Sequence, residues 1–207
     1  MINTHTKNSK TWTTLTLAAV AAVAVATDAV AGQRGHGGGK QTRFERLDVS
    51  GDGYLDVSEL QAPAVRKAAR KFDRKDGDSS GSLDFEEYTT GRHSRDFSDM
   101  ADEIVACVAE LKEDTGEDRI QVPDAERFRS PAERFADIDE NGDEMLSPDE
   151  VEAAVSAKVE AGFAAADTSG DSLLTQDEYR AHRVSTRITQ RAVRACVIEI
   201  QSEDEVI

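Results

Sequence analysis

The stretch Asp76-Gly-Asp-Ser-Ser-Gly-Ser-Leu-Asp-Phe-Glu-Glu87 carries oxygen-bearing side chains at regular intervals. Counted from its first residue, positions 1, 3, 5, 9 and 12 are Asp76, Asp78, Ser80, Asp84 and Glu87. Ca²⁺ takes 6–8 oxygen ligands at about 2.3–2.6 Å, and a curling loop with this spacing turns alternate side chains and one backbone carbonyl inward. The glycine at position 6 permits the positive φ that the sharp turn needs. The stretch is therefore predicted to be a calcium-binding loop.

The same pattern occurs four times, at 48–59, 76–87, 139–150 and 167–178, which we call loops one to four. The distance along the sequence from loop one to loop two equals that from loop three to loop four. A phenylalanine stands four residues before each loop (Phe44, Phe72, Phe135 and Phe163), and position 8 is always leucine (Leu55, Leu83, Leu146 and Leu174). A repeat kept in register over this many positions argues against four coincidental acidic segments.

The candidate calcium ligands are the side chains at positions 1, 3, 5, 9 and 12 and the carbonyl at position 7. In loops one and two they are Asp48, Ser50, Asp52, Tyr54, Asp56 and Glu59, and Asp76, Asp78, Ser80, Ser82, Asp84 and Glu87. In loops three and four the candidates are limited to positions 1, 3, 5, 7 and 12, which are Asp139, Asn141, Asp143, Met145 and Glu150, and Asp167, Ser169, Asp171, Leu173 and Glu178. The pattern predicts up to four bound calcium ions.

Loops three and four depart from the pattern at position 6, where Glu144 and Ser172 replace glycine. A non-glycine residue at positive φ costs roughly 1 kcal/mol. Loops one and two also have four carboxylates each at positions 1, 3, 5, 9 and 12, whereas loops three and four have three. Tighter calcium binding is therefore expected in loops 48–59 and 76–87.

Residues 44–88 and 135–179 resemble the EF-hand superfamily, and their arrangement in two pairs is similar to the plan of calmodulin-like proteins. The resemblance implies an all-α fold of helix–calcium loop–helix units, each pair followed by an additional amphipathic helix. It also implies a short β-bridge between paired loops, for which Leu55–Leu83 and Leu146–Leu174 are the expected partners. No loop matches the strict D-x-[DN]-x-[DN]-G pattern. Dockerin modules also repeat a calcium loop, but the preceding phenylalanines and the glutamates at position 12 favour complete EF-hands.

The segments between the loops of each half, 60–75 and 151–166, are shorter than in the calmodulin-like plan, so the helices there are expected to be short. Pro63 is predicted to end the helix that leaves loop one, and Ala64–Lys75 to form the helix that enters loop two. Positions 9 and 12 of every loop have the spacing of a capping box, so the residues that close the calcium shell should also start the next helix.

Composition divides the chain along its length. The predicted segments are 1–31, a signal peptide; 32–40, a Gly-rich linker; 41–92, the first EF-hand pair; 93–113, a helix with Cys107; 114–129, a connector; 130–182, the second EF-hand pair; and 183–207, a C-terminal helix and acidic tail. The apolar run 15–26 follows two lysines, as in a secretory signal. It is too short for a membrane span, which needs about 20 residues. An uncleaved tail is the alternative.

Apolar periodicity predicts an amphipathic helix over Ser94–Lys112, which would cover the core of the first pair, and a final helix over Arg183–Gln201. Ser130 and Glu133 form a capping box before loop three. The two cysteines, Cys107 and Cys196, follow the first and second pair. In a secreted chain they are expected to form a disulfide, although two buried free thiols fit the sequence as well.

The net charge is -16, from 41 acidic and 25 basic residues. This balance argues against a nucleic-acid partner. We expect a secreted or periplasmic calcium-binding protein without catalysis, acting as a buffer or a calcium-stabilised module. The alternative is a sensor that exposes an apolar groove to an unknown protein partner, although the chain has few methionines for such a groove. No nucleophile, zinc or phosphate-loop motif of an enzyme is present in the sequence.

Overall fold

The chain is mostly helical in the residues that a computed structural model describes, which are 41–91 and 95–204. The helices are α1 (Arg43–Leu47), α2 (Val57–Lys75), α3 (Phe85–Thr89), α4 (Ala101–Thr115), α5 (Pro131–Ala136), α6 (Pro148–Ala166) and α7 (Gln176–Asp204), with 3-10 turns η2 (Ser98–Met100) and η3 (Ala125–Phe128). The described residues contain isolated β-bridges and no longer strand, so the all-α prediction is confirmed. The predicted signal peptide and linker lie outside this part of the chain. None of the described helices is long and apolar enough to cross a membrane.

One 19-residue helix joins the two loops in each half of the chain: α2 joins loops one and two, and α6 joins loops three and four. The prediction that the helix after loop one ends at Pro63 is wrong, because α2 passes through this residue. Proline removes one backbone donor inside the helix. A capping box of Asp56 and Glu59 at the start of α2 and the buried Phe72 near its end hold the helix on either side.

These long helices change which loops can meet. At a rise of about 1.5 Å per residue, a helix as long as α2 or α6 spans about 28 Å, so the loops at its two ends are held apart. The bridges instead join Leu55 to Leu174 and Leu83 to Leu146, both antiparallel. In each bridge both residues exchange backbone N–H···O bonds, with N···O distances of 2.8–3.0 Å. The expected bridges within each half of the chain are therefore wrong: loop one pairs with loop four, and loop two with loop three.

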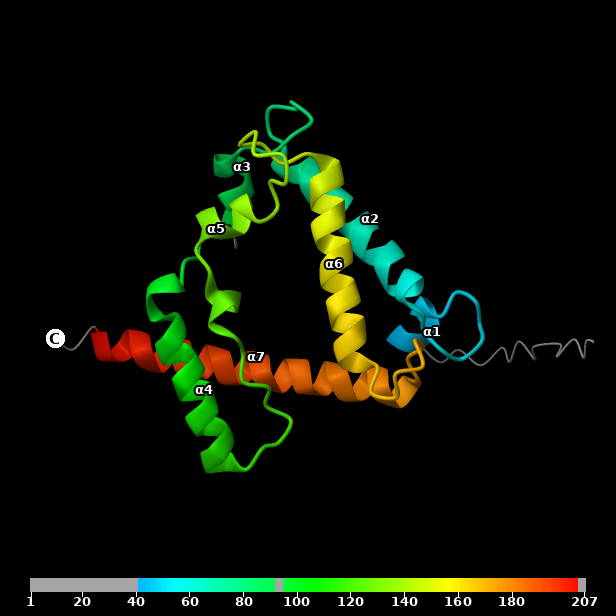
Figure 1. Cartoon of the computed structure of the whole chain (residues 1–207), viewed down its shortest axis with the longest axis vertical. Helices are drawn as coiled ribbons and strands as arrows, with labels where there is room; N and C mark the ends of the chain where they lie inside the picture. The colour runs from blue at the N-terminus through cyan, green and yellow to red at the C-terminus, as the bar shows by residue number, and fades with distance from the viewer. Residues whose placement is uncertain (1–40, 92–94, 205–207) are drawn as a thin grey trace, which may run out of the picture. The chain divides into compact units, whose positions relative to one another are not determined.

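Figure 1 shows the consequence for the helices, with α2 and α6 side by side. Because the loop before α2 meets the loop after α6, the two helices run antiparallel. The side-chain amide of Gln61 on α2 also donates to Glu160 on α6 at 2.9 Å. The segments 41–92 and 130–182 are thus halves of the sequence rather than separately packed pairs. Both belong to the single unit Lys40–Ile207.

Each loop pair has its own apolar core, built from the phenylalanines before the loops and the leucines at position 8. One cluster of buried residues contains Phe44, Leu55, Phe163, Ala166 and Leu174. The other contains Phe72, Leu83, Tyr88, Phe135 and Leu146. The repeat positions found in the sequence therefore face the core, and they pack across the two halves of the chain.

A third core lies between α4, η3 and α7, away from the loop pairs. Its buried residues are Ile104, Val108, Ile120, Phe128, Ala192 and Cys196. The disulfide between Cys107 and Cys196 confirms the predicted bond and ties α4 to α7. The expectation that this helix covers the first pair's core is wrong, since α4 packs on the C-terminal helix. The segment 114–129, predicted to be a polar connector, contributes Ile120 and Phe128 to this core.

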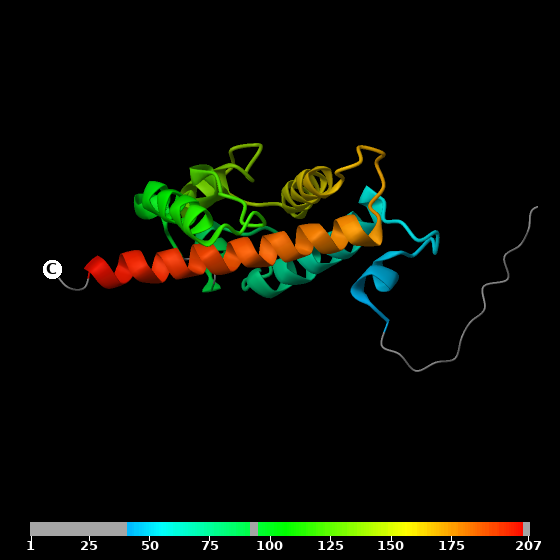
Figure 2. The same ribbon diagram turned by 90° about the horizontal axis from the view of Figure 1, so that it is seen from below.

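Helices α4 and α7 also differ in extent from their predictions. The helix expected over Ser94–Lys112 begins later, at Ala101, directly after the η2 turn. It stops before Gly116, which has φ 62°. The helix expected from Arg183 is one continuous helix with the segment that leaves loop four, as Figure 2 shows.

Candidate metal centre

The aspartate at position 1 is held in the same way in all four loops. One of its carboxylate oxygens accepts the backbone N–H of position 6 at 2.9–3.1 Å. The four pairs are Asp48 with Gly53, Asp76 with Gly81, Asp139 with Glu144, and Asp167 with Ser172. This bond fixes the aspartate across the turn with protein groups alone, which reduces the ordering cost of binding an ion.

Position 6 has the positive φ that the sequence predicted. The values are 85° and 86° at Gly53 and Gly81, and 65° and 66° at Glu144 and Ser172. The strain expected in loops three and four is therefore present in the structure. At all four positions the backbone turns left-handed, the region that costs an L-residue about 1–2 kcal/mol.

Every loop has a second left-handed position, position 4, which was not predicted from the sequence. Its φ is 74° at Gly51, 72° at Gly142 and 73° at Gly170, but loop two has Ser79 there, at 61°. Loop one thus has glycine at both left-handed positions, and each of the other loops has one strained residue. Backbone strain therefore does not distinguish loop two from loops three and four. The expectation that loop two binds calcium more tightly than those loops rests on its additional carboxylate alone. Glycines at position 4 of three loops were the signal that could have revealed this.

We expect Ser79→Gly to relieve this strain and raise the calcium affinity of loop two by about fivefold, which corresponds to roughly 1 kcal/mol. The matched control is Ser79→Ala, which also removes the hydroxyl but keeps a Cβ at positive φ. Calorimetric titration of both variants measures the difference. An equal gain for the two variants would trace the effect to the hydroxyl and not to the backbone.

The glutamate at position 12 links each loop to the helix that follows it. In loop one, Glu59 accepts the N–H groups of Val49 and Ser50 with one oxygen, and the N–H of Asp56 with the other. The equivalent glutamates, Glu87, Glu150 and Glu178, make the corresponding bonds to the start of the loop and to position 9. The predicted capping boxes at positions 9 and 12 are present in the structure, so each glutamate reaches across its own loop and begins a helix.

In loops three and four these bonds also lower the pKa of the position 12 carboxylate. The backbone N–H and hydroxyl of Thr175, together with the hydroxyl of Thr168, lower the pKa of Glu178 to about 2. The backbone N–H and hydroxyl of Ser147 likewise lower the pKa of Glu150. A carboxylate that stays charged well below neutral pH is a suitable ligand for a hard divalent cation.

The side chains at positions 3 and 5 are also turned by local bonds. A position 5 oxygen accepts the N–H of position 7 in every loop, from Asp52, Ser80, Asp143 and Asp171. At position 3, the hydroxyls of Ser50 and Ser169 donate to the position 1 aspartate at 3.1 Å. The Ser80 hydroxyl of loop two donates to the carbonyl of Ser82, itself a predicted ligand, at 3.0 Å. Calcium would have to replace this last bond.

Loop two brings its carboxylates closest together. Oxygens of Asp76, Asp78 and Glu87 all lie within 4.8 Å of one another. Within the residues that the structure describes, this is the one such group of three acidic, histidine or cysteine side chains. In loop one, Asp56 is engaged by the Ser58 hydroxyl at 2.6 Å and the Glu59 N–H at 2.9 Å, so it acts as a helix cap.

The donor set fits calcium. Carboxylate, hydroxyl, amide and carbonyl oxygens suit a hard cation, and the predicted ligands include no thiolate or imidazole of the kind that zinc and copper prefer. Positions 1, 3, 5 and 12 of each loop would supply side-chain oxygens, and position 7 a carbonyl. The metal would provide charge neutralisation and a fixed geometry at the start of α2, α3, α6 and α7.

The comparison with protein families matches residues 40–63 to the EF hand. The matched segment contains α1, loop one and the first turns of α2, so it covers one helix–loop–helix unit. The match supports calcium binding and the EF-hand superfamily for this chain. No curated protein matches the sequence.

Proposed function

We propose that this protein is a non-catalytic calcium-binding protein, secreted or periplasmic, in which four EF-hand loops bind up to four calcium ions as a buffer or a calcium-stabilised module. The observation that carries the proposal is the bond from the N–H of position 6 to the position 1 aspartate, repeated in all four loops although the family match covers only loop one. The acidic composition and the disulfide support an extracytoplasmic, calcium-rich compartment. Extracellular calcium-binding modules have dissociation constants for calcium of about 10⁻⁴–10⁻³ M.

Calorimetric titration of residues 32–207, with far-ultraviolet circular dichroism before and after calcium, tests this function. We expect saturable binding with only a small gain in helix, because the capping boxes that begin the helices consist of protein groups alone. The matched control replaces all four position 12 glutamates by glutamine, which keeps a hydrogen-bond acceptor but removes the charge. Absence of binding at millimolar calcium, or equal binding by the control, would refute the proposal.

The sensor function is the second candidate, and one cavity favours it. A space of about 530 Å³ lies beside α2 and α6, and its lining combines apolar residues such as Phe72, Leu83 and Val151 with charged ones such as Lys71 and Lys158. A sensor would expose such a surface only when calcium binds. Fluorescence of a dye for apolar surfaces, rising with calcium in parallel with a large helix gain, would favour the sensor over the buffer.

A further inference from the structure

A small cavity between α1 and α7 is lined by arginines. Its volume is about 260 Å³, and its lining residues are Thr42, Arg43, Phe44, Gln176, Tyr179, Arg180, Arg183, Val184 and Arg187. The lining contains four arginines and no aspartate or glutamate. This sign is opposite to that of the whole chain, whose net charge is -16. The cavity lining contains none of the candidate calcium ligands.

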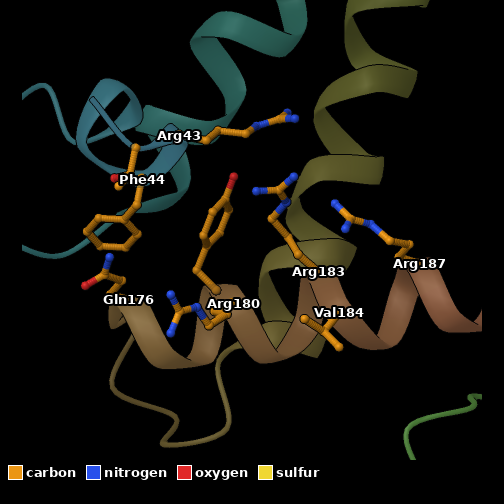
Figure 3. Close-up of a pocket in the computed structure, with 9 residues that line it drawn as sticks. Arg43, Phe44, Gln176, Arg180, Arg183, Val184 and Arg187 are labelled. Atoms are coloured by element: carbon orange, nitrogen blue, oxygen red, sulfur yellow. The ribbon is translucent and has the colours of Figure 1, made fainter. Parts of the chain in front are cut away.

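The arginines come together from distant parts of the sequence. Arg180, Arg183 and Arg187 are spaced by three and four residues, so they form one stripe along α7. Arg43 reaches the same cavity from α1. Figure 3 shows the guanidinium groups of Arg43, Arg183 and Arg187 extending into the space between the two helices, whereas that of Arg180 points away from it.

These charges have no acidic partner in the described part of the chain. None of the four guanidinium groups forms an ion pair with a carboxylate there. Arg183 is half-buried, and its guanidinium lies over the ring of Tyr179 at 5.5 Å. Tyr179 in turn packs edge-on against Phe44, with ring centroids 5.8 Å apart. The ring of Tyr179, packed against Phe44, thus holds the Arg183 side chain in place. This contact lowers the entropy cost of ordering Arg183 around a ligand.

We propose that this cavity is a binding site for a phosphate group. A guanidinium presents a fixed fork of N–H donors that matches the oxygens of phosphate or carboxylate. One carboxylate would neutralise a single charge, whereas a phosphate monoester carries about -1.5 to -2 and three acceptor oxygens. Three converging arginines therefore match a dianionic tetrahedral group better than a carboxylate. The small volume suits a compact group, either on a soluble molecule or on a lipid headgroup.

The test compares two double variants of the same helix. Arg183→Gln with Arg187→Gln removes two lining charges. Arg191→Gln with Arg194→Gln removes two charges of α7 that are exposed, as Arg187 is, but lie outside the cavity lining. Binding of methyl phosphate is measured by calorimetry in calcium-depleted buffer without a chelator, since chelators are themselves polyanions. We expect millimolar or tighter binding that weakens by about tenfold for each lining arginine removed, and by less than about twofold in the control pair.

Two further binding measurements test the class of the ligand and its source. Acetate should bind at least tenfold more weakly than methyl phosphate, and equal affinity would overturn the proposal. Phosphatidylcholine vesicles with and without phosphatidic acid identify the source of the phosphate: binding that needs this lipid and the lining arginines assigns a headgroup, and binding of methyl phosphate alone assigns a soluble ligand. Equal losses in the two double variants, or no binding of either phosphate, would refute the site. This outcome is independent of calcium binding, because none of the altered residues belongs to a loop.

Discussion

Replacing Cys107 and Cys196 by alanine is expected to lower the free energy of unfolding by about 2–5 kcal/mol. The disulfide closes a sequence separation of 89 residues. Its loss therefore frees a long loop in the unfolded chain. It also joins α4 to α7 inside a core that contains none of the loop residues. Chemical denaturation in the absence of calcium measures the effect.

Wild-type protein under reducing conditions is the control for this variant, because it loses the bond but keeps both sulfur atoms. Cys196 is only 1% exposed. Alanine there also leaves a small cavity, and the reduced wild type separates the two contributions. Calcium stoichiometry should be unchanged, since the bond lies outside both loop pairs. An unfolding midpoint that does not move on reduction would show that packing alone holds α4 on α7.

The loops themselves were predictable because their chemistry is local. Each loop contains the aspartate at position 1, the turn at position 6 and the glutamate at position 12 in one short segment, and each capping box is complete within four residues. The buried phenylalanines and leucines could likewise be predicted from the repeat. These features depend on spacing along one short segment, which is what the sequence displays directly.

The pairing of the loops could not be predicted in the same way, because it depends on whether one helix continues through Pro63. A break at this proline would let loops one and two fold back on each other, whereas a continuous α2 holds them about 28 Å apart. Proline inside a helix costs about 3 kcal/mol, so the local signal favoured the break. Packing of α2 along α6, together with the two β-bridges between the first and second halves of the chain, outweighs that cost.

The arginine-lined cavity could not be predicted from the sequence for a related reason. Arg43 and Arg183 lie near opposite ends of the described chain, and they meet because loop one pairs with loop four. The same pairing brings Phe44 against Tyr179. Long-range neighbours of this kind follow from topology, which a repeat with two possible pairings leaves open.

Glu59→Gln is expected to abolish tight calcium binding in loop one and to weaken binding in loop four, while loops two and three keep their affinity. Loss of an indirect, supporting contact at a metal site typically costs about 10–100-fold in affinity, and loss of the charged position 12 ligand should cost no less. Loop four is affected because Leu55 and Leu174 exchange backbone bonds of 3.0 and 2.8 Å, so disorder in one loop disturbs the other. The amide NMR signals of the position 8 leucines report each loop during a calcium titration.

The matched variant is Glu87→Gln, which should give the complementary pattern: loops two and three are weakened through the bridge of Leu83 and Leu146, and loops one and four are retained. Together the two variants distinguish the two pairings, because glutamine keeps a hydrogen-bond acceptor for the capping box of the next helix and the disulfide is unchanged. If Glu59→Gln shifted the Leu83 signal and left Leu174 unchanged, the loops would pair within each half of the chain. The phosphate cavity between α1 and α7 would then lose the contact between loops one and four that brings its two walls together.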